Sequence, residues 1–351
     1  MSVSCTEFGQ IPGVGTVHLY HIENTSGAFA EVTEYGAILV RLVVPDSQGK
    51  LTDVVLGYED PGQYAVNACF FGSTIGRNGN RIAGAQFSLD QETFTLAQNE
   101  FENNLHSGPN GFEKKLWEAE IVSETAVRFS RVSPDLENGF PGRFDISVTY
   151  EFTEEAQLKL TYEGCSDKTT VANMTNHSYF NLSGEGSGDI LDQELMLYAS
   201  FFTPVHDTKS IPTGELRPVK GTVMDFTVPK AIGLQIDEAD EQLAYTGGYD
   251  HNFVCDKYQK GEVTPVAVAV SKKTGIRMSV FSDCPCVQFY AGNFIKEEQG
   301  KNGHIYRKRN GFCLETQVEP NAINMPEFHS PVLKAGEKYL SRTIYQFDTV
   351  G

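Results

Sequence analysis

The side chains best suited to proton transfer in this sequence are one glutamate and two histidines. Glu315 follows the apolar run 312–314, and a buried carboxylate costs free energy unless it is ion-paired or takes part in chemistry. His177 stands among asparagines and aromatic residues, and His106 follows two asparagines close to the only tryptophan. A carboxylate and an imidazole can hold opposite protonation states near neutral pH, as acid–base catalysis requires. For Glu315 an internal ion pair is the structural alternative, and for each histidine it is a hydrogen-bonding role.

The segment around His177 is unusually polar for a strand. If residues 173–181 are extended, alternate side chains share one face that carries asparagine, threonine, histidine and tyrosine. Most of these side chains both donate and accept hydrogen bonds, which suits the recognition of hydroxyl groups. The alternative is the solvent face of an edge strand, although such faces usually carry Lys, Glu and Thr.

Two glycine-rich segments carry further polar side chains. Residues 72–82 hold Asn80 and Arg81 among three close glycines, but no Lys-Ser/Thr ending follows, which argues against a phosphate-binding loop. A surface turn with solvated arginines is the alternative there. Residues 247–253 hold Asp250, which would equally serve as a turn residue before a strand.

Composition narrows the classes of partner. The formal net charge of -18 at pH 7 repels phosphate backbones and anionic lipid heads, so nucleic acid and membrane surfaces are not expected. Seven cysteines are an odd number in a long chain, which favours reduced thiols. Residues 1–15 carry neither the basic nor the apolar region of a signal peptide. We therefore expect a cytoplasmic protein.

Metal-ligand spacing is not evident in the sequence. Cys284 and Cys286 are separated by one residue, which is closer than a usual zinc-ligand pair, and no second pair accompanies them. The sequence therefore predicts no metal site and no cofactor.

Strand patterns dominate the elements that must position these side chains. Apolar and polar residues largely alternate in 127–132, 145–152 and 158–162, which is typical of antiparallel sheets with one buried face. Other strand-like runs are 37–45, 266–270, 277–281 and 286–290. Helix patterns are confined to 61–70 and, weakly, 231–243. We predict one all-β domain over residues 1–351, a sandwich or barrel.

Taken together, these segments resemble the aldose 1-epimerase (galactose mutarotase) family. The most specific matches are residues 176–182 (NHSYFNL), 249–253 (YDHNF), 288–294 (QFYAGNF) and 314–317 (LETQ). Supporting matches lie at 76–77, 80–82, 105–106, 111–112, 133–135 and 139–142, in the same order as in the family. The sequence departs from the family pattern at Glu113, where members often have Asp, and at Asn321, where Asp usually follows the proline. The second departure lies where it would affect the rim of a cleft.

The resemblance implies a fold and a set of site residues. The implied fold is a galactose mutarotase-like β-supersandwich, with large antiparallel sheets, few short helices and an open cleft. The family's catalytic positions fall on Glu315, as general base, and His177, as general acid. Its sugar-binding positions fall on Asn80, Arg81, His106, Asp250 and Gln288.

The implied activity is the interconversion of the α and β anomers of free hexoses such as galactose and glucose, without a cofactor, by a monomer or homodimer. Two other functions remain open at this point. One is a glycoside hydrolase that uses Asp250 and Glu315 as its carboxylate pair. The other is a sugar-binding or regulatory protein that has lost activity.

Overall fold

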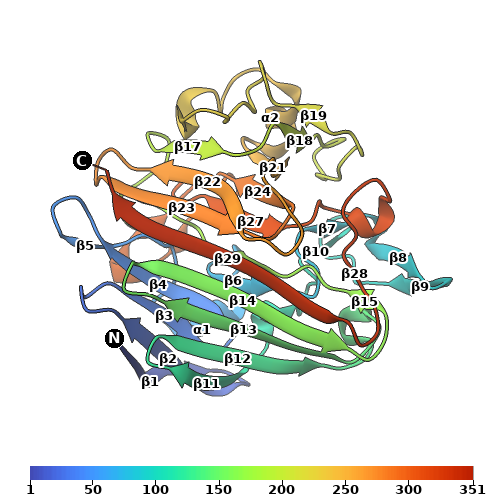
Figure 1. Ribbon diagram of the computed structural model, residues 1–351, viewed down its shortest axis with the longest axis horizontal. Helices are drawn as coiled ribbons and strands as arrows, with labels where there is room; N and C mark the ends of the chain where they lie inside the picture. The colour runs from blue at the N-terminus through green and yellow to red at the C-terminus, as the bar shows by residue number, and fades with distance from the viewer. Residues whose placement is uncertain (351) are drawn as a thin grey trace.

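Antiparallel sheets make up most of the computed structural model, which describes residues 1–350 (Figure 1). The largest sheet has nine strands. In sheet order they are β11 (Glu118–Ser123), β12 (Ala126–Ser133), β13 (Phe144–Phe152), β14 (Gln157–Ser166), β29 (Lys338–Thr349), β23 (Ile276–Ser282), β22 (Thr264–Val270), β17 (Glu194–Leu197) and β20 (Lys230–Ala231). Figure 1 shows β29 crossing the middle of the molecule, between β14 and β23.

A five-stranded sheet at the N-terminus packs on one face of this large sheet. Its strands are β1 (Ser2–Ile11), β2 (Gly15–Glu23), β3 (Phe29–Thr33), β4 (Ile38–Pro45) and β5 (Leu51–Asp53). Side chains from both sheets, such as Val32 of β3 and Tyr150 of β13, join one buried apolar cluster. The alternation predicted for β13 is observed, since every second residue from Phe144 to Phe152 is buried and the residues between them are partly or fully exposed.

A second five-stranded sheet carries the polar segments noted in the sequence. Its order is β19 (Arg217–Pro218), β18 (Phe201–Thr203), β21 (Asp250–Val254), β24 (Cys286–Tyr290) and β27 (Cys313–Gln317). The register pairs Gln288 with Glu315, and paired residues point to the same face of a sheet. The other face carries Phe289 and Leu314, which belong to the main core. This sheet therefore has one polar face, which carries Gln288 and Glu315, and one apolar face, which packs on the main core.

Short elements complete the described chain. The two-stranded pairs are β6 (Ser73–Ile75) with β16 (Thr175–His177), β7 (Arg81–Ile82) with β10 (Asn104–Leu105), β8 (Gln86–Leu89) with β9 (Glu92–Thr95), β15 (Thr170–Val171) with β28 (Val332–Leu333), and β25 (Glu298–Gln299) with β26 (Ile305–Tyr306). The two α-helices found in residues 1–350 are α1 (Pro61–Val66) and α2 (Glu241–Thr246). Neither these nor the short 3₁₀ turns provide an apolar helix of membrane-spanning length.

The all-β prediction is confirmed, but two local predictions are wrong. The helix expected over 231–243 is a 3₁₀ turn at Ile232–Leu234, and α2 starts only at Glu241. Asp240 caps α2 by accepting the backbone N–H groups of Gln242 and Leu243, so the helix begins near the end of the predicted range. The extended stretch expected over 173–181 is a strand only at Thr175–His177. The expectation of one domain over residues 1–351 stays a prediction.

Candidate active site

One pocket, with a volume of 250 Å³, collects six of the seven side chains predicted to act in catalysis or binding. Its lining residues are Ala68, Cys69, Phe70, Asn80, Arg81, Glu100, Leu105, His106, His177, Tyr179, Asp250, Tyr290, Phe294 and Glu315. The seventh predicted residue, Gln288, lies behind the wall and donates a 2.7 Å hydrogen bond to Asp250. Segments that are far apart in the sequence therefore contribute side chains to one pocket.

Glu315 is the central carboxylate of this pocket. It sits in the middle of β27, the edge strand of the second five-stranded sheet, and its side chain is almost fully buried. Burial raises the pKa of Glu315 well above its ordinary value, and the nearby Asp250 carboxylate raises it further, while Arg81 opposes both. Its Oε2 atom has no hydrogen-bond partner in the described chain, so it is free to accept a proton from a bound molecule.

His177 faces Glu315 from the end of β16. Its Nε2 atom is 3.7 Å from Glu315 Oε1, and its Nδ1 atom is 3.5 Å from the thiol sulfur of Cys313. Burial lowers the pKa of His177 to about 4, because the charged imidazolium loses its hydration. Cys313 and Glu315 are alternate residues of β27 and therefore reach the same histidine from one strand face.

His106 approaches the same point from the other side of the pocket. Its ring and that of His177 meet edge to face with centroids 5.2 Å apart. Its Nδ1 atom lies 3.1 Å from the backbone N–H of Asn80, which makes Nδ1 the acceptor and leaves the proton on Nε2. Burial lowers the pKa of His106 well below its ordinary value, with His177 and Arg81 adding to the effect. A neutral, hydrogen-donating imidazole results.

Asn80 and His106 hold each other in strained backbone conformations. Both have positive φ angles, 59° and 54°, which non-glycine residues rarely adopt and which concentrate at functional sites. The backbone N–H of His106 donates to Asn80 O at 3.0 Å, so the two residues are bonded in both directions.

Two charged groups complete the polar wall. Arg81 begins β7 and makes a bidentate ion pair with Glu100, with distances of 2.6 and 2.8 Å, which fixes the plane of its guanidinium. Asp250 begins β21, and burial raises its pKa against the opposing effects of Arg81 and Gln288. The arrangement presents directed donors and acceptors of the kind that ring hydroxyls require.

Aromatic side chains form the remaining wall. Phe70, Tyr179 and Tyr290 pack around the His177 ring with centroid distances of 5.7, 5.1 and 6.3 Å. Phe294 stacks on Tyr290 and is 61% exposed, so it stands at the mouth of the pocket. The pyranose ring of a sugar offers C–H faces that pack well on such rings.

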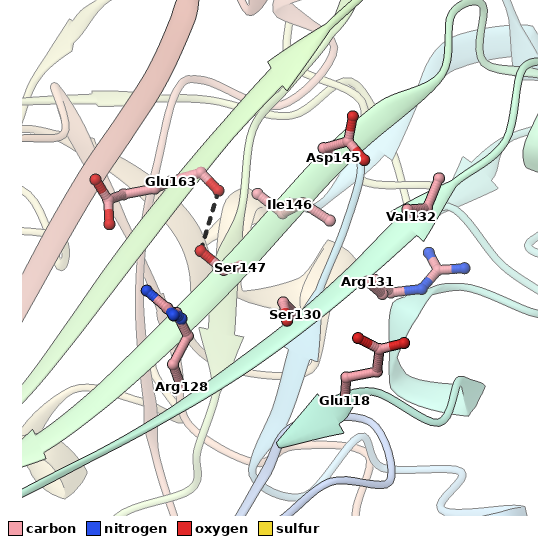
Figure 2. A pocket seen from close by; sticks show the side chains of 9 residues that line it. All are labelled: Glu118, Arg128, Ser130, Arg131, Val132, Asp145, Ile146, Ser147 and Glu163. Atoms are coloured by element: carbon pink, nitrogen blue, oxygen red, sulfur yellow. Dashed lines mark hydrogen bonds between the residues drawn. The ribbon is translucent and has the colours of Figure 1, made fainter. Parts of the chain in front are cut away.

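A second depression, on the outer face of the large sheet, lacks this chemistry. It has a volume of 420 Å³ and is lined by Glu118, Arg128, Ser130, Arg131, Val132, Asp145, Ile146, Ser147 and Glu163 (Figure 2). Figure 2 shows these side chains along neighbouring strands of the large sheet, from Glu118 of β11 to Glu163 of β14, with Ser147 donating to the backbone oxygen of Glu163. Its lining includes no histidine and none of the predicted residues. The 250 Å³ pocket is therefore the candidate active site.

Comparison with known proteins agrees with this choice. The family model described as aldose 1-epimerase matches residues 18–346. Galactose mutarotase from Sus scrofa is 40% identical over 349 residues, which is 99% of each chain, and aldose 1-epimerase from Escherichia coli K12 is 36% identical over 94% of each. The chain belongs to the aldose 1-epimerase family. Galactose 1-epimerase from Lactobacillus acidophilus superposes with a TM-score of 0.87 at 25% identity and full coverage of both chains. The galactose mutarotase-like fold is thereby confirmed.

The two departures from the family pattern lie outside the pocket lining. Glu113 is buried in a 3₁₀ turn, and burial raises its pKa to about 7. Asn321 accepts the backbone N–H of Ala83 at 3.0 Å, and its own N–H donates to Arg81 O at 2.8 Å. Asn321 is thus bonded to the chain at Arg81, a residue of the pocket lining, and its expected effect on the rim stays a prediction.

Sequence reasoning missed some members of this aldose epimerase site. Glu100 and Phe70 carry no local sequence signal, because only the fold brings them to the pocket, and Phe294 ends the 288–294 match but was given no role there. Cys313 is visible in hindsight as the residue two positions before Glu315 on one strand. The alternative of a surface turn with solvated arginines at 72–82 does not hold, because Arg77 and Arg81 are both buried.

Proposed function

We propose that this protein is an enzyme that interconverts the α and β anomers of free hexoses such as galactose and glucose. The observation that carries the proposal is the meeting of Glu315 and His177, 3.7 Å apart, within a pocket of fixed hydroxyl-binding groups. The relatives named galactose mutarotase cover nearly the whole chain, which supports the same reaction.

The reaction needs two proton transfers at the anomeric end of the sugar. Glu315 takes the proton of the C1 hydroxyl as His177 gives a proton to the ring oxygen, the C1–O5 bond breaks, and an aldehyde forms. Rotation about C1–C2 exposes the other face of the aldehyde. Ring closure then returns the proton from Glu315 to the oxygen on C1 and the proton on the ring oxygen to His177. The protons balance over the cycle, and no electron is gained or lost.

Burial of Glu315 and His177 favours the form of the pair in which both side chains are neutral. Before ring opening, the working form is a Glu315 carboxylate beside a His177 imidazolium, and afterwards both groups are neutral. A dry site disfavours charge, as the raised pKa of Glu315 and the lowered pKa of His177 indicate. The charged working form is therefore a minor form of the pair, and the proton transfers return the pair to its favoured neutral form.

The other polar residues hold the sugar in place. His106 donates its Nε2–H toward the ring oxygen of the sugar and stabilises the negative charge that develops on that oxygen. Asp250, kept in place by Gln288, accepts hydrogen bonds from hydroxyls on the far side of the ring. Asn80 and Arg81 bind the same side, and the C1 end stays free to rotate.

Several broader expectations belong to this proposal. The enzyme works without a nucleotide or redox cofactor, because no step transfers electrons or a phosphoryl group. The net charge of -18 supports a protein that binds neither nucleic acid nor membranes. We also propose that the enzyme is cytoplasmic and that its single-domain chain acts as a monomer or homodimer.

Polarimetry tests the proposal directly. Fresh α-D-galactose and α-D-glucose should reach anomeric equilibrium faster with the protein than in buffer, and methyl α-D-galactoside should not be hydrolysed. Glu315→Gln should still bind sugar but lose activity by a factor on the order of 10²–10⁴, the usual weight of a positioned proton-transfer group. Full activity in folded Glu315→Gln, or release of methanol from the glycoside, would overturn the assignment.

A further inference from the structure

A second cluster of proton-bearing side chains lies away from the pocket lining. Cys286 begins β24, Glu319 follows β27, and His329 lies in the loop before β28. One ligand atom from each residue, the thiol sulfur, a carboxylate oxygen and a ring nitrogen, lies within 4.8 Å of the other two. Three strand ends that are distant in sequence thus place sulfur, oxygen and nitrogen donors at one point.

The cluster is buried on two sides and open on the third. Cys286 and Glu319 are almost fully buried, whereas the His329 side chain is 43% exposed. The Nδ1 atom of His329 lies 2.9 Å from Glu319 Oε1, and its backbone N–H donates to Glu319 Oε2 at 3.1 Å. The exposed imidazole therefore covers two buried acidic groups on the side that faces solvent.

Cys286 and Glu319 place a thiol and a carboxylate side by side in the interior. A divalent cation would displace the thiol proton and neutralise both negative groups at once.

We propose that Cys286, Glu319 and His329 form a binding site for a divalent cation of the zinc class. Thiolate, imidazole and carboxylate are all ligands of Zn²⁺, which prefers a tetrahedral set with bonds of roughly 2.0–2.3 Å. The three donor atoms lie within 4.8 Å of one another, so we expect side-chain movements alone to bring them to that geometry, with water as the fourth ligand. The combined charge of a thiolate and a carboxylate matches the charge of the ion.

The site would brace the active site without entering the reaction. Cys286 lies two residues before Gln288 on β24, and Glu319 lies four residues after Glu315. The loop between Glu319 and His329 contains Asn321, which is bonded to the backbone at Arg81 and Ala83. Cross-linking that loop to β24 through a cation therefore stabilises the wall that carries Arg81.

A cobalt titration distinguishes this site from the catalytic cluster. His106, His177 and Glu315 also offer three ligand atoms within 4.8 Å, so the experiment uses the full-length, reduced, metal-free His106→Asn protein to weaken that alternative. We expect one equivalent of Co²⁺ to bind with the near-ultraviolet charge-transfer absorption of a cobalt–thiolate bond. Zn²⁺ should displace the cobalt, abolish the absorption and raise the melting temperature.

Substitutions in the same background assign the ligands. Cys286→Ser should remove the thiolate absorption, and His329→Gln, at an exposed position, should weaken binding by roughly tenfold or more. His304→Gln is the matched control, because His304 pairs with Glu185 at 2.8 Å as His329 pairs with Glu319 but belongs to no cluster of three ligands in the described chain. Absence of the absorption in His106→Asn, its persistence in Cys286→Ser, or equal affinity in His329→Gln would overturn the proposal. None of these outcomes depends on epimerase activity.

Discussion

At the scale of single residues, Glu315 and His177 act as one titrating pair. The pair holds one proton in its working state, and the two protonation equilibria belong to the pair because the groups are adjacent. Both are displaced by burial, in opposite directions. This displacement widens the pH range over which the singly protonated state exists.

The pH profile of kcat/KM follows from those directions. Below the lowered pKa of His177, about 4, both groups carry protons and no base remains. Above the raised pKa of Glu315, both have lost their protons and no acid remains. Activity should therefore rise as the pH increases through about 4, stay level across neutral pH, and fall at the alkaline limb. Polarimetric rates, corrected for the buffer reaction, measure this profile. An acid limb near 6.5, the ordinary histidine value, would contradict it.

The two histidines should differ in kinetic effect. His177 delivers a proton, so His177→Asn should lower kcat far more than it raises KM. His106 acts through position and charge stabilisation, so His106→Asn should damage both parameters while measurable turnover remains. Steady-state kinetics with a separate measurement of sugar affinity tests this division. Wild-type kcat in His177→Asn, together with none in His106→Asn, would assign the acid to the other histidine.

Cys313 gives a third prediction at this scale. Burial, with Glu315 nearby, raises the pKa of the Cys313 thiol well above its ordinary value, so the sulfur stays a neutral thiol. It can accept the Nδ1–H of the His177 imidazolium at 3.5 Å and so hold the ring with Nε2 directed at Glu315. Cys313→Ala should lower kcat by roughly fivefold, the weight of one hydrogen bond of about 1 kcal/mol, with KM little changed, and Cys313→Ser should recover activity. Equal kcat in all three proteins would show that the thiol does not position the imidazole.

At the scale of elements, the loop between β6 and β7 is held by one buried cation. Arg77 is almost fully buried and donates to the carbonyl oxygens of Ser133, Pro134, Pro141 and Gly142 and to the hydroxyls of Ser133 and Thr170. Its guanidinium thereby fastens the segment that ends in Asn80 and Arg81 to the strands around β12 and β13. The loop is a rigid part of the site wall.

Arg77→Lys should expose how much that anchor contributes. A lysine has three donors and no planar fork, so several buried acceptors lose their partners at about 1–3 kcal/mol each. The free energy of unfolding in urea should fall by roughly 3 kcal/mol or more, and KM should rise because Asn80 and Arg81 lose support. Arg128→Lys, at a half-exposed residue paired with Glu120, should change stability by about 0.5 kcal/mol or less. Similar losses in both variants would contradict the anchoring role.

Element patterns show what the sequence could and could not predict. The alternation in 145–152 predicted β13 well, because one side of that strand faces the core and the other faces solvent. The region 231–243 misled the helix prediction, since its apolar residues pack as a turn and a loop before the Asp240 cap. Around His177, side-chain hydrogen bonds such as Ser178 to Asn176, 2.6 Å, compete with the strand ladder. Local periodicity does not record such competition.

At the scale of the whole molecule, the sheets bring distant segments together that no short pattern connects. The family motifs identified Glu315 and His177 because each motif is local, and the structure then placed them in one pocket. Glu100 and Phe70 could not be found in this way, since their roles arise from loops meeting in three dimensions. The Cys286 cluster was missed for the same reason, because its ligands are spread over 44 positions of the chain from Cys286 to His329.

Chelation tests how the two sites are related in the whole enzyme. The proposed cation supports the fold and takes no part in proton transfer, so prolonged treatment with a strong chelator should leave kcat unchanged. The same treatment should lower the melting temperature of zinc-loaded protein, because a ligand at 100 times its dissociation constant stabilises the native state by about 2.7 kcal/mol. Cys286→Ser should show neither binding nor the thermal shift, and its melting temperature should not respond to the chelator. Activity that disappears on chelation and returns with one added metal would instead place a cation in the reaction, and the cofactor-free mechanism at Glu315 and His177 would be wrong.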